Sequence, residues 1–549
     1  MKKHHGTTRR LLAAVLAVST LVLAGATAGS GSVAADQYTV VLAGTPTKDG
    51  FQLAGTKSAV LDLVASAGGT VTLDLTRQIG VLYADSPNAS FDETLRTSSL
   101  VADVGEDFVW KAFPSYREAV DSGQLTVVTE GVCPDPEDPD CPPGGPDPHT
   151  DVLEGLQWDM HMIRAPEAHA HPEGQAGSPL VEVGILDTGI DGEHLDFVDP
   201  DGAEYPGSRL PFSNVNCDKG ADFVFLGPGL GVPGDPCTDN NFHGTHVAGI
   251  VAARPNIDGV VGVAPNVELI PVKVCDASGY CYSRSTAAGI TYAGDMKFEV
   301  INMSFFVDDD TFLNSTMYKC ANDPVQRTFR HANERAIQYA RNQGVVPVAA
   351  LGNSNHDLAH PPEPFENECD VVPAETQGVI GTMSLGPSSE KAYFSNYGNF
   401  ATDVAAPGGN SDNPNTVPGP CGNEILSTIP GNLWGCFQGT SMASPHAAGV
   451  AALIVSQFGR IGNDAGETDV RMRPQDVESD LQASAIDLVH PFDRSLQGYD
   501  HCFGHGRVDA LRAVLRETDD EDFPVVTEQD SPSGCPTYNV DEPANPPND

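Results

Sequence analysis

The residue with the clearest chemical potential is Ser441, which lies in the sequence Gly-Thr-Ser-Met-Ala-Ser-Pro-His over residues 439–446. Pro445 and the small apolar residues of 447–455 predict a helix that is buried all round. Ser441 would then lie at the helix N-terminus, where unpaired backbone N–H groups favour developing negative charge. A serine there is well placed to be a nucleophile, although an isolated serine before a helix is more often a structural N-cap.

Three further polar residues stand where an α/β fold places chemistry. Asp187 ends a predicted strand, Asn353 follows another, and His243 opens a helix in the sequence His-Gly-Thr-His-Val-Ala-Gly. Acyl transfer needs this set, because a serine hydroxyl is a weak nucleophile until a histidine accepts its proton. A carboxylate fixes the histidine tautomer, and an Asn amide with a backbone N–H stabilises the oxyanion. Each residue alone has a common structural interpretation, as a turn former or a buried polar group.

Alternating apolar runs and helical patterns predict the fold that positions these residues. A parallel α/β sheet with helices on both faces follows, and active residues in such sheets lie at the carboxyl ends of strands. Helices are expected around 246–253 and 330–342. The predicted strands are 181–186, 269–274, 300–303, 345–350 and 379–381.

Taken in chain order, the four motifs resemble those of the subtilisin-like serine peptidases (subtilase family). The resemblance covers about residues 153–516, including the closing Phe-Gly-His-Gly-Arg-Val-Asp-Ala of 503–510. It implies a subtilisin-like serine endopeptidase that acts on protein or peptide substrates and needs no cofactor for catalysis. In that family's scheme Asp187 orients the base, His243 is the base, Ser441 attacks, and Asn353 stabilises the oxyanion.

Two segments before the α/β region have predicted roles in export and in inhibition of the peptidase. Residues 1–35 are typical of a secretory signal peptide, with a basic start, an apolar stretch and a small-residue cleavage site, which predicts a secreted, extracellular protein. Residues 36–132 predict a small α+β domain and resemble the inhibitory propeptide of subtilases, so the chain's own propeptide is an expected partner. Residues 133–152 form a linker rich in Pro and acidic residues, and 517–549 form an acidic tail.

The resemblance also indicates a substrate groove between two chain segments. One wall would be Ser304, Phe305 and Phe306, where the family often has a Leu-Gly pair in place of Phe305-Phe306. The bulky pair would narrow or reshape the subsites. The other wall would be Ala350, Leu351 and Gly352, whose small and apolar character favours neutral residues before the scissile bond.

Charge and cysteine content restrict the partners and the compartment. A net charge of −45 opposes binding to nucleic acid or anionic lipid. No apolar stretch is long enough for a membrane span. A monomer is expected. The 12 cysteines favour disulfides in an exported protein. Pairing by proximity gives Cys133–Cys141, Cys217–Cys237, Cys275–Cys281, Cys320–Cys369, Cys421–Cys436 and Cys502–Cys535.

Other candidate sites have stronger structural interpretations. His246 follows His243 by three positions, without the Glu and the spacing of four of a zinc peptidase, so packing is expected for it and for His446. Acidic loops at 199–202 and 308–310 lack EF-hand spacing, so solvated loops are expected there, while structural calcium stays open and metal ligands are unknown.

Three functional hypotheses remain, of which two are peptidases and the third belongs to another class. The first is a broad secreted endopeptidase made as an autoinhibited precursor, and the second is a processing peptidase with one partner protein. The third is a non-catalytic binding protein on a peptidase scaffold, which nothing in the sequence supports. A lipase or esterase is disfavoured because Ala443 stands where the Gly-x-Ser-x-Gly motif has its second glycine.

Overall fold

Seven parallel strands form the central sheet of the computed structural model, in the order β10-β11-β9-β13-β14-β15-β16. The structure describes residues 35–128, 153–172, 175–199, 208–226, 232–256, 259–307, 323–359, 370–461, 470–489, 498–518, 526–527 and 535. The strands of the sheet are β9 (Glu182–Asp187), β10 (Ala221–Asp222), β11 (Glu268–Lys273), β13 (Val300–Met303), β14 (Val346–Ala350), β15 (Ile380–Leu385) and β16 (Val404–Pro407).

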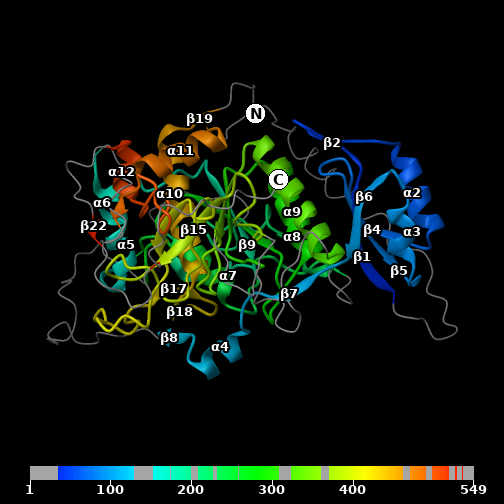
Figure 1. Ribbon diagram of the computed structural model, residues 1–549. Coiled ribbons are helices and arrows are strands. Elements are labelled where there is room, and N and C mark those ends of the chain that lie inside the picture. The colour runs from blue at the N-terminus through cyan, green and yellow to red at the C-terminus, as the bar shows by residue number, and fades with distance from the viewer. Residues whose placement is uncertain are drawn as a thin grey trace, which may run out of the picture.

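Alternate side chains of these strands enter two hydrophobic cores, one on each face of the sheet. Ile185 packs into the core with α7 (His243–Ala252) and α10 (Thr440–Phe458), whereas Leu186 packs into the core with α8 (Ser283–Met296) and α9 (Pro324–Gln343). Both faces are therefore covered by helices, as Figure 1 shows. This arrangement confirms the predicted fold class, because a parallel sheet buries both faces.

Shorter elements complete this main unit. The helices are α5 (Trp158–Met162), α6 (Ala165–Ala170), α11 (Pro474–Ser484) and α12 (Ala510–Leu515), and the strands are β12 (Tyr280–Tyr282), β17 (Ile425–Ile429), β18 (Leu433–Phe437), β19 (Arg460–Ile461), β20 (Val470–Arg471), β21 (Leu488–Val489) and β22 (Val526–Thr527).

A small α+β unit precedes the main unit and lies beside α8 and α9 (Figure 1). Its four-stranded antiparallel sheet has the order β4-β5-β1-β6, and two helices pack on one face. The elements of this N-terminal unit are β1 (Asp36–Leu42), β2 (Gly44–Thr47), β3 (Gly50–Leu53), α2 (Lys57–Ser66), β4 (Thr70–Leu75), β5 (Val81–Ser86), α3 (Phe91–Arg96) and β6 (Val101–Glu106).

After β6 the chain leaves the N-terminal unit and crosses the main unit. This crossing segment, residues 107–128, contains β7 (Val109–Lys111), α4 (Tyr116–Ser122) and β8 (Thr126–Val128). β7 pairs with β12, and β8 pairs with β18, both antiparallel. The segment therefore makes its strand pairs with the main unit and none with the sheet that precedes it.

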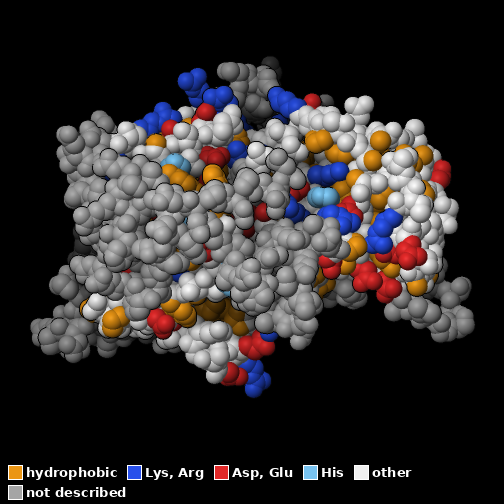
Figure 2. Space-filling view, in the orientation of Figure 1, with side chains coloured by type: hydrophobic (Ala, Val, Ile, Leu, Met, Phe, Trp, Pro, Cys, Tyr) orange, Lys and Arg blue, Asp and Glu red, His pale blue; other side chains and the backbone are white. Residues whose placement is uncertain are grey.

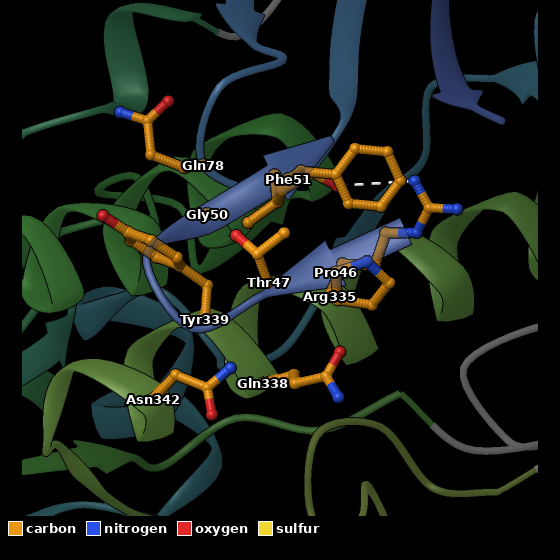
Figure 3. A pocket seen from close by; sticks show the side chains of 10 residues that line it. Pro46, Thr47, Gly50, Phe51, Gln78, Arg335, Gln338, Tyr339 and Asn342 are labelled. Atoms are coloured by element: carbon orange, nitrogen blue, oxygen red, sulfur yellow. Dashed lines mark hydrogen bonds between the residues drawn. The ribbon is translucent and has the colours of Figure 1, made fainter. Parts of the chain in front are cut away.

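Arg335 of α9 joins the two units at the hairpin formed by β2 and β3. Its Nη1 donates to the carbonyl oxygens of Leu42 and Gly80 at 3.0 and 3.1 Å. The guanidinium carbon lies 4.5 Å from the centroid of the Phe51 ring, an arrangement visible in Figure 3. Burial lowers the pKa of Arg335 to about 10, so it stays charged at neutral pH and satisfies carbonyls at the end of β1 and before β5.

Two carboxylates, one at the end of the N-terminal unit and one at the start of the crossing segment, bind basic side chains of α8 and α9. Asp103 accepts hydrogen bonds from Arg327 at 2.7 and 2.9 Å and lies 3.4 Å from His331, and Asp107 accepts one from Arg284 at 2.5 Å. Acidic and basic side chains gather along this junction in Figure 2. Burial alone would raise the pKa of Asp103, but the hydrogen bonds from His331 and Arg327 lower it to about 2.

Four of the six predicted disulfides are present: Cys217–Cys237, Cys275–Cys281, Cys421–Cys436 and Cys502–Cys535. The predicted bonds Cys133–Cys141 and Cys320–Cys369 lie outside the described residues, as does the predicted signal peptide. Among the helices that the structure describes, none has the length and apolar character to cross a bilayer.

The depressed pKa of Asp103 predicts how the contact between the units depends on pH. Its contribution of about 2 kcal/mol is present above the ordinary pKa near 4 and is lost as pH falls towards 2. In a Ser441→Ala precursor, Asp103→Asn should lower Tm at pH 6 and flatten the decline of Tm between pH 4 and 2. Thermal unfolding across this range measures both, with Asp62→Asn as the exposed control. Parallel curves for the precursor with and without Asp103→Asn would contradict the prediction.

Candidate functional site

Asp187 and His243 meet at the carboxyl edge of the sheet, where β9 ends and α7 begins. His243 Nδ1 lies 2.9 Å from Asp187 Oδ1 and 3.0 Å from Oδ2, and both side chains are fully buried. The helix can start this close to the strand because Gly244 has no side chain. A Cβ at Gly244 would lie 2.1 Å from the carbonyl oxygen of Gly189.

A second buried carboxylate, Asp239, holds these two ends together. Its Oδ1 accepts from the hydroxyl of Thr188, the residue after Asp187, at 3.0 Å. Its Oδ2 accepts from the backbone N–H and the hydroxyl of Thr245, two residues after His243, at 3.0 and 2.7 Å. Burial raises the pKa of Asp239, and these hydrogen bonds oppose the shift. Asp239 thus fixes the relative position of the strand end and the helix start.

Ser441 is the second residue of α10, as the sequence predicts, and is 4% exposed. Its Oγ donates to the carbonyl oxygen of Ser304 at 2.8 Å. In return the hydroxyl of Ser304 donates to the carbonyl oxygen of Ser441 at 2.7 Å and accepts from Asn302 Nδ2 at 2.8 Å. Ser304, predicted to line the groove, is fully buried and supports the turn that carries Ser441.

Asn353 is exposed just beyond β14 and faces the start of α10. Its Oδ1 accepts from the backbone N–H and the hydroxyl of Thr440, both at 2.9 Å. The amide is therefore oriented by its oxygen, and Nδ2 remains as a donor. Gly439 allows this approach, because a Cβ there would lie 3.3 Å from Asn353 Nδ2. The structure thus brings Asn353 beside the turn of Ser441.

Phe113 of the crossing segment covers His243. The two rings are stacked with centroids 3.6 Å apart and an interplanar angle of 20°, and Phe113 is 4% exposed. His243 Nε2 is buried without a hydrogen-bond partner, and the Ser441 hydroxyl points to Ser304. The base and the hydroxyl are therefore present but not hydrogen-bonded to each other.

The chain before Phe113 lies along an edge that the sequence analysis missed. Tyr280, Cys281 and Tyr282 of β12 pair with Lys111, Trp110 and Val109 of β7. The carbonyl oxygen of Gly279 accepts from the backbone N–H of Ala112 at 2.9 Å and of Phe113 at 3.2 Å. The disulfide between Cys275 and Cys281 was predicted from the closeness of the two residues in sequence. That short spacing was the signal from which a tight turn leading into β12 could have been predicted.

The remaining predicted groove residues have different environments. Phe305 is 1% exposed and lies 6.2 Å from Trp110 between ring centroids, so it faces the crossing segment. Phe306 is half-buried. Ala350 and Leu351 are fully buried at the end of β14, and the Gly352 backbone N–H donates to the Thr440 hydroxyl at 3.1 Å. Their roles in binding a substrate stay predictions.

His246 and His446 have the packing roles expected of them. His246 Nε2 lies 3.0 Å from the carbonyl oxygen of Gly435, and burial lowers its pKa to about 3, so it is neutral. His446 Nε2 lies 3.0 Å from Asp159 Oδ2. Within the described ranges no three His, Cys, Asp or Glu side chains form a metal-binding group. The loops 200–202 and 308–310 lie outside those ranges, so the solvated loops expected there stay a prediction.

Comparison with known proteins identifies the same region. The Subtilase family (Peptidase_S8) model matches residues 180–506. The alkaline protease of Alkalihalobacillus alcalophilus is 34% identical over 306 residues, 56% of this chain and 61% of that protein. The thermophilic serine proteinase of Bacillus sp. (strain AK1) is 31% identical over 67% of this chain and 69% of its own. The alignment thus spans about three fifths of the first relative's length.

Solved structures show the same fold. The epidermin leader peptide processing serine protease of Staphylococcus aureus matches with a TM-score of 0.60 and 18% identity. The match covers 91% of this chain and all of that one.

Asp239 generates a prediction about the stability of the site. Asp239→Ala leaves the hydroxyl protons of the buried Thr188 and Thr245 without an acceptor, and each such loss costs about 1–3 kcal/mol. We expect Tm of the Ser441→Ala precursor to fall by several degrees, measured by thermal unfolding. Asp412→Ala, at an exposed position, is the control. An unchanged Tm in Asp239→Ala would contradict the positioning role.

Proposed function

Because the chain belongs to the subtilase family of serine peptidases, we propose that it is a secreted serine endopeptidase made as an autoinhibited precursor. The observation that carries the proposal is the buried hydrogen bond between Asp187 and His243, which leaves His243 Nε2 buried and unpaired. No cofactor is needed for this chemistry in the family. Secretion is inferred from residues 1–35 and from the disulfides.

In the proposed mechanism, Asp187 keeps the proton of His243 on Nδ1, so that Nε2 is free to accept one. His243 Nε2 takes the proton of the Ser441 hydroxyl, and Ser441 Oγ attacks the carbonyl carbon of the substrate. His243 then gives that proton to the leaving amine, which leaves an acyl-enzyme on Ser441 for water to hydrolyse.

The oxyanion of the tetrahedral intermediate would be bound by Asn353 Nδ2 and by a backbone N–H at the start of α10. Both donors are fixed before substrate arrives, since Thr440 orients the Asn353 amide and the helix fixes its own N-terminus. Preorganised donors of this kind each contribute roughly 2.7–4 kcal/mol to lowering the barrier. The Ser441 hydroxyl must leave the carbonyl oxygen of Ser304 to reach His243.

Autoinhibition is inferred from the crossing segment. Residues 109–113 occupy the β12 edge in the extended form expected of a substrate, while the Phe113 ring covers His243. Three arginines of α8 and α9 anchor this segment: Arg284 binds Asp107 at its start, and Arg327 and Arg335 bind the N-terminal unit that precedes it. Because the inhibitor is part of the same chain, its local concentration at the site is high and does not depend on dilution.

A narrower processing role is the second candidate. Trp110, 3% exposed, is enclosed by the rings of Phe108, Phe305 and Phe329, with centroids 5.4–6.2 Å away. A subsite filled by an indole favours substrates with a large aromatic residue at the corresponding position. The structural relative from Staphylococcus aureus is itself described as a leader peptide processing protease.

Casein hydrolysis by the secreted protein beside a Ser441→Ala variant tests the proposal. The wild type should digest casein and begin between Cys133 and Leu153 after maturation, since the Pro-rich, acidic composition of that linker predicts an accessible cleavage site. Ser441→Ala should remain a precursor. N-terminal sequencing of both products measures maturation. Maturation without casein hydrolysis would favour the processing peptidase, and an intact N-terminal unit with no cleavage by either protein would refute the peptidase assignment.

Phe113→Ala tests the inhibitory contact. Removing the ring uncovers His243, so a fluorophosphonate should label Ser441 of the freshly isolated precursor about tenfold faster than in wild type, a change of about 1.4 kcal/mol. The labelling rate is read from gel fluorescence, with Phe400→Ala as the exposed control. Equal labelling rates in the wild-type and Phe113→Ala precursors would show that Phe113 does not block the site.

A further inference from the structure

The crossing segment does not leave the main unit after it passes His243. It continues through α4, whose first turn is closed by a capping box between Ser115 and Glu118, and ends that helix at Gly123. β8 then pairs with β18, with Thr126, Val127 and Val128 opposite Cys436, Gly435 and Trp434. Extended chain is therefore bound on both sides of Phe113, by β12 before it and by β18 after it.

β18 leads directly into the turn of Ser441. It ends at Phe437, four residues before Ser441, and its other edge is taken by β17. In the described structure, only β8 covers the second edge. Removal of the crossing segment would leave the N–H and C=O groups of this edge free, next to the nucleophile. Free strand edges recruit extended chains, which is how many peptide-binding proteins hold their ligands.

An apolar surface lies beside this edge. Ala119 and Leu125, at most 2% exposed, pack in one cluster with Phe242 and Ile429 of the main unit. The partly buried side chains around this cluster are Val127, Leu433 and Phe437. Phe242 directly precedes His243 and Phe437 belongs to β18, so the apolar surface is continuous with the proposed active site. Its chemistry matches an extended segment that carries branched aliphatic side chains.

We propose that β18, Phe242, Ile429 and Leu433 form a second substrate-binding surface for the leaving-group side of polypeptide substrates. The inference rests on the proposed function and adds a specificity determinant to it. The preferred substrate carries an aliphatic strand roughly a dozen residues after the cleaved bond, as Leu125 and Val127 follow Phe113 here. Residues 115–128 occupy this surface in the precursor as a stand-in for that strand.

A synthetic peptide of residues 115–128 tests the surface on the mature enzyme obtained from the full chain. We expect it to bind enzyme blocked with a fluorophosphonate, measured by fluorescence anisotropy. With active enzyme it should slow casein hydrolysis about tenfold and change hydrolysis of a short peptide p-nitroanilide less than about twofold. The p-nitroanilide has no residues after the cleaved bond. The matched control peptide carries Leu125→Ser and Val127→Ser, and it should neither bind the blocked enzyme nor slow casein hydrolysis.

The enzyme itself gives an independent test. Leu433→Asp should raise KM for casein about tenfold, because a charge replaces an apolar contact at the edge of the surface, and Phe400→Asp should not. Absence of peptide binding, or equal inhibition of both substrates, would overturn the second surface. Failure of the wild type to cleave the p-nitroanilide would instead refute the proposed function, since that substrate does not reach β18.

Discussion

The buried hydrogen bond between Asp187 and His243 is the constraint on which the rest of the structure depends. Two buried polar side chains are stable only when their partners are placed to within a few tenths of an ångström. The end of β9 and the start of α7 must therefore be held in one register. Asp239 does this from one side and the absence of a side chain at Gly244 permits it from the other.

By the proposed function, the strand edges that bind the crossing segment are also those that would bind a substrate. β12 holds the chain before Phe113 and β18 holds the chain after it, so the crossing segment uses backbone hydrogen bonds on both sides of the site. In the proposed precursor the block to catalysis would be local, because an aromatic ring lies against His243 and the Ser441 hydroxyl is bonded to Ser304. Pro114, which follows Phe113, also lacks the N–H that an ordinary leaving amide carries.

Much of the fold could be predicted from the sequence, because its strands are buried on both faces and appear as uninterrupted apolar runs. The strand predicted at 300–303 has the observed bounds, and those predicted at 181–186 and 269–274 are displaced by one residue. The helix expected around 246–253 begins at His243, as the His-Gly-Thr-His motif predicts, and the one expected around 330–342 begins at Pro324. Both starts are fixed by tertiary contacts and caps, such as Asp323 at α9.

The edges of the groove were not predictable in this way. β12, β17 and β18 are short strands whose existence depends on partners distant in sequence, and β7 and β8 exist only as their complements. Likewise, the predicted domain 36–132 was defined by local pattern, whereas residues 107–128 belong spatially to the main unit. The sequence motifs could single out the four polar residues because each lies in a characteristic run of neighbouring residues. The strand edges come from segments that are distant in sequence, so they have no such local motif.

The way the crossing segment is held determines how the proposed autoinhibition would end. A cut in the linker 133–152 would remove the covalent connection but none of the contacts of Arg284, Arg327 and Arg335, nor the two strand pairs. The inhibitor would then stay bound until those contacts fail together or the segment is degraded. The hydrogen bonds from His331 and Arg327 hold the pKa of Asp103 low, so this anchor is intact above about pH 4 and weakens only as the pH falls towards 2. Activity would therefore follow release of the N-terminal unit, and the cleavage that precedes release would leave the site covered.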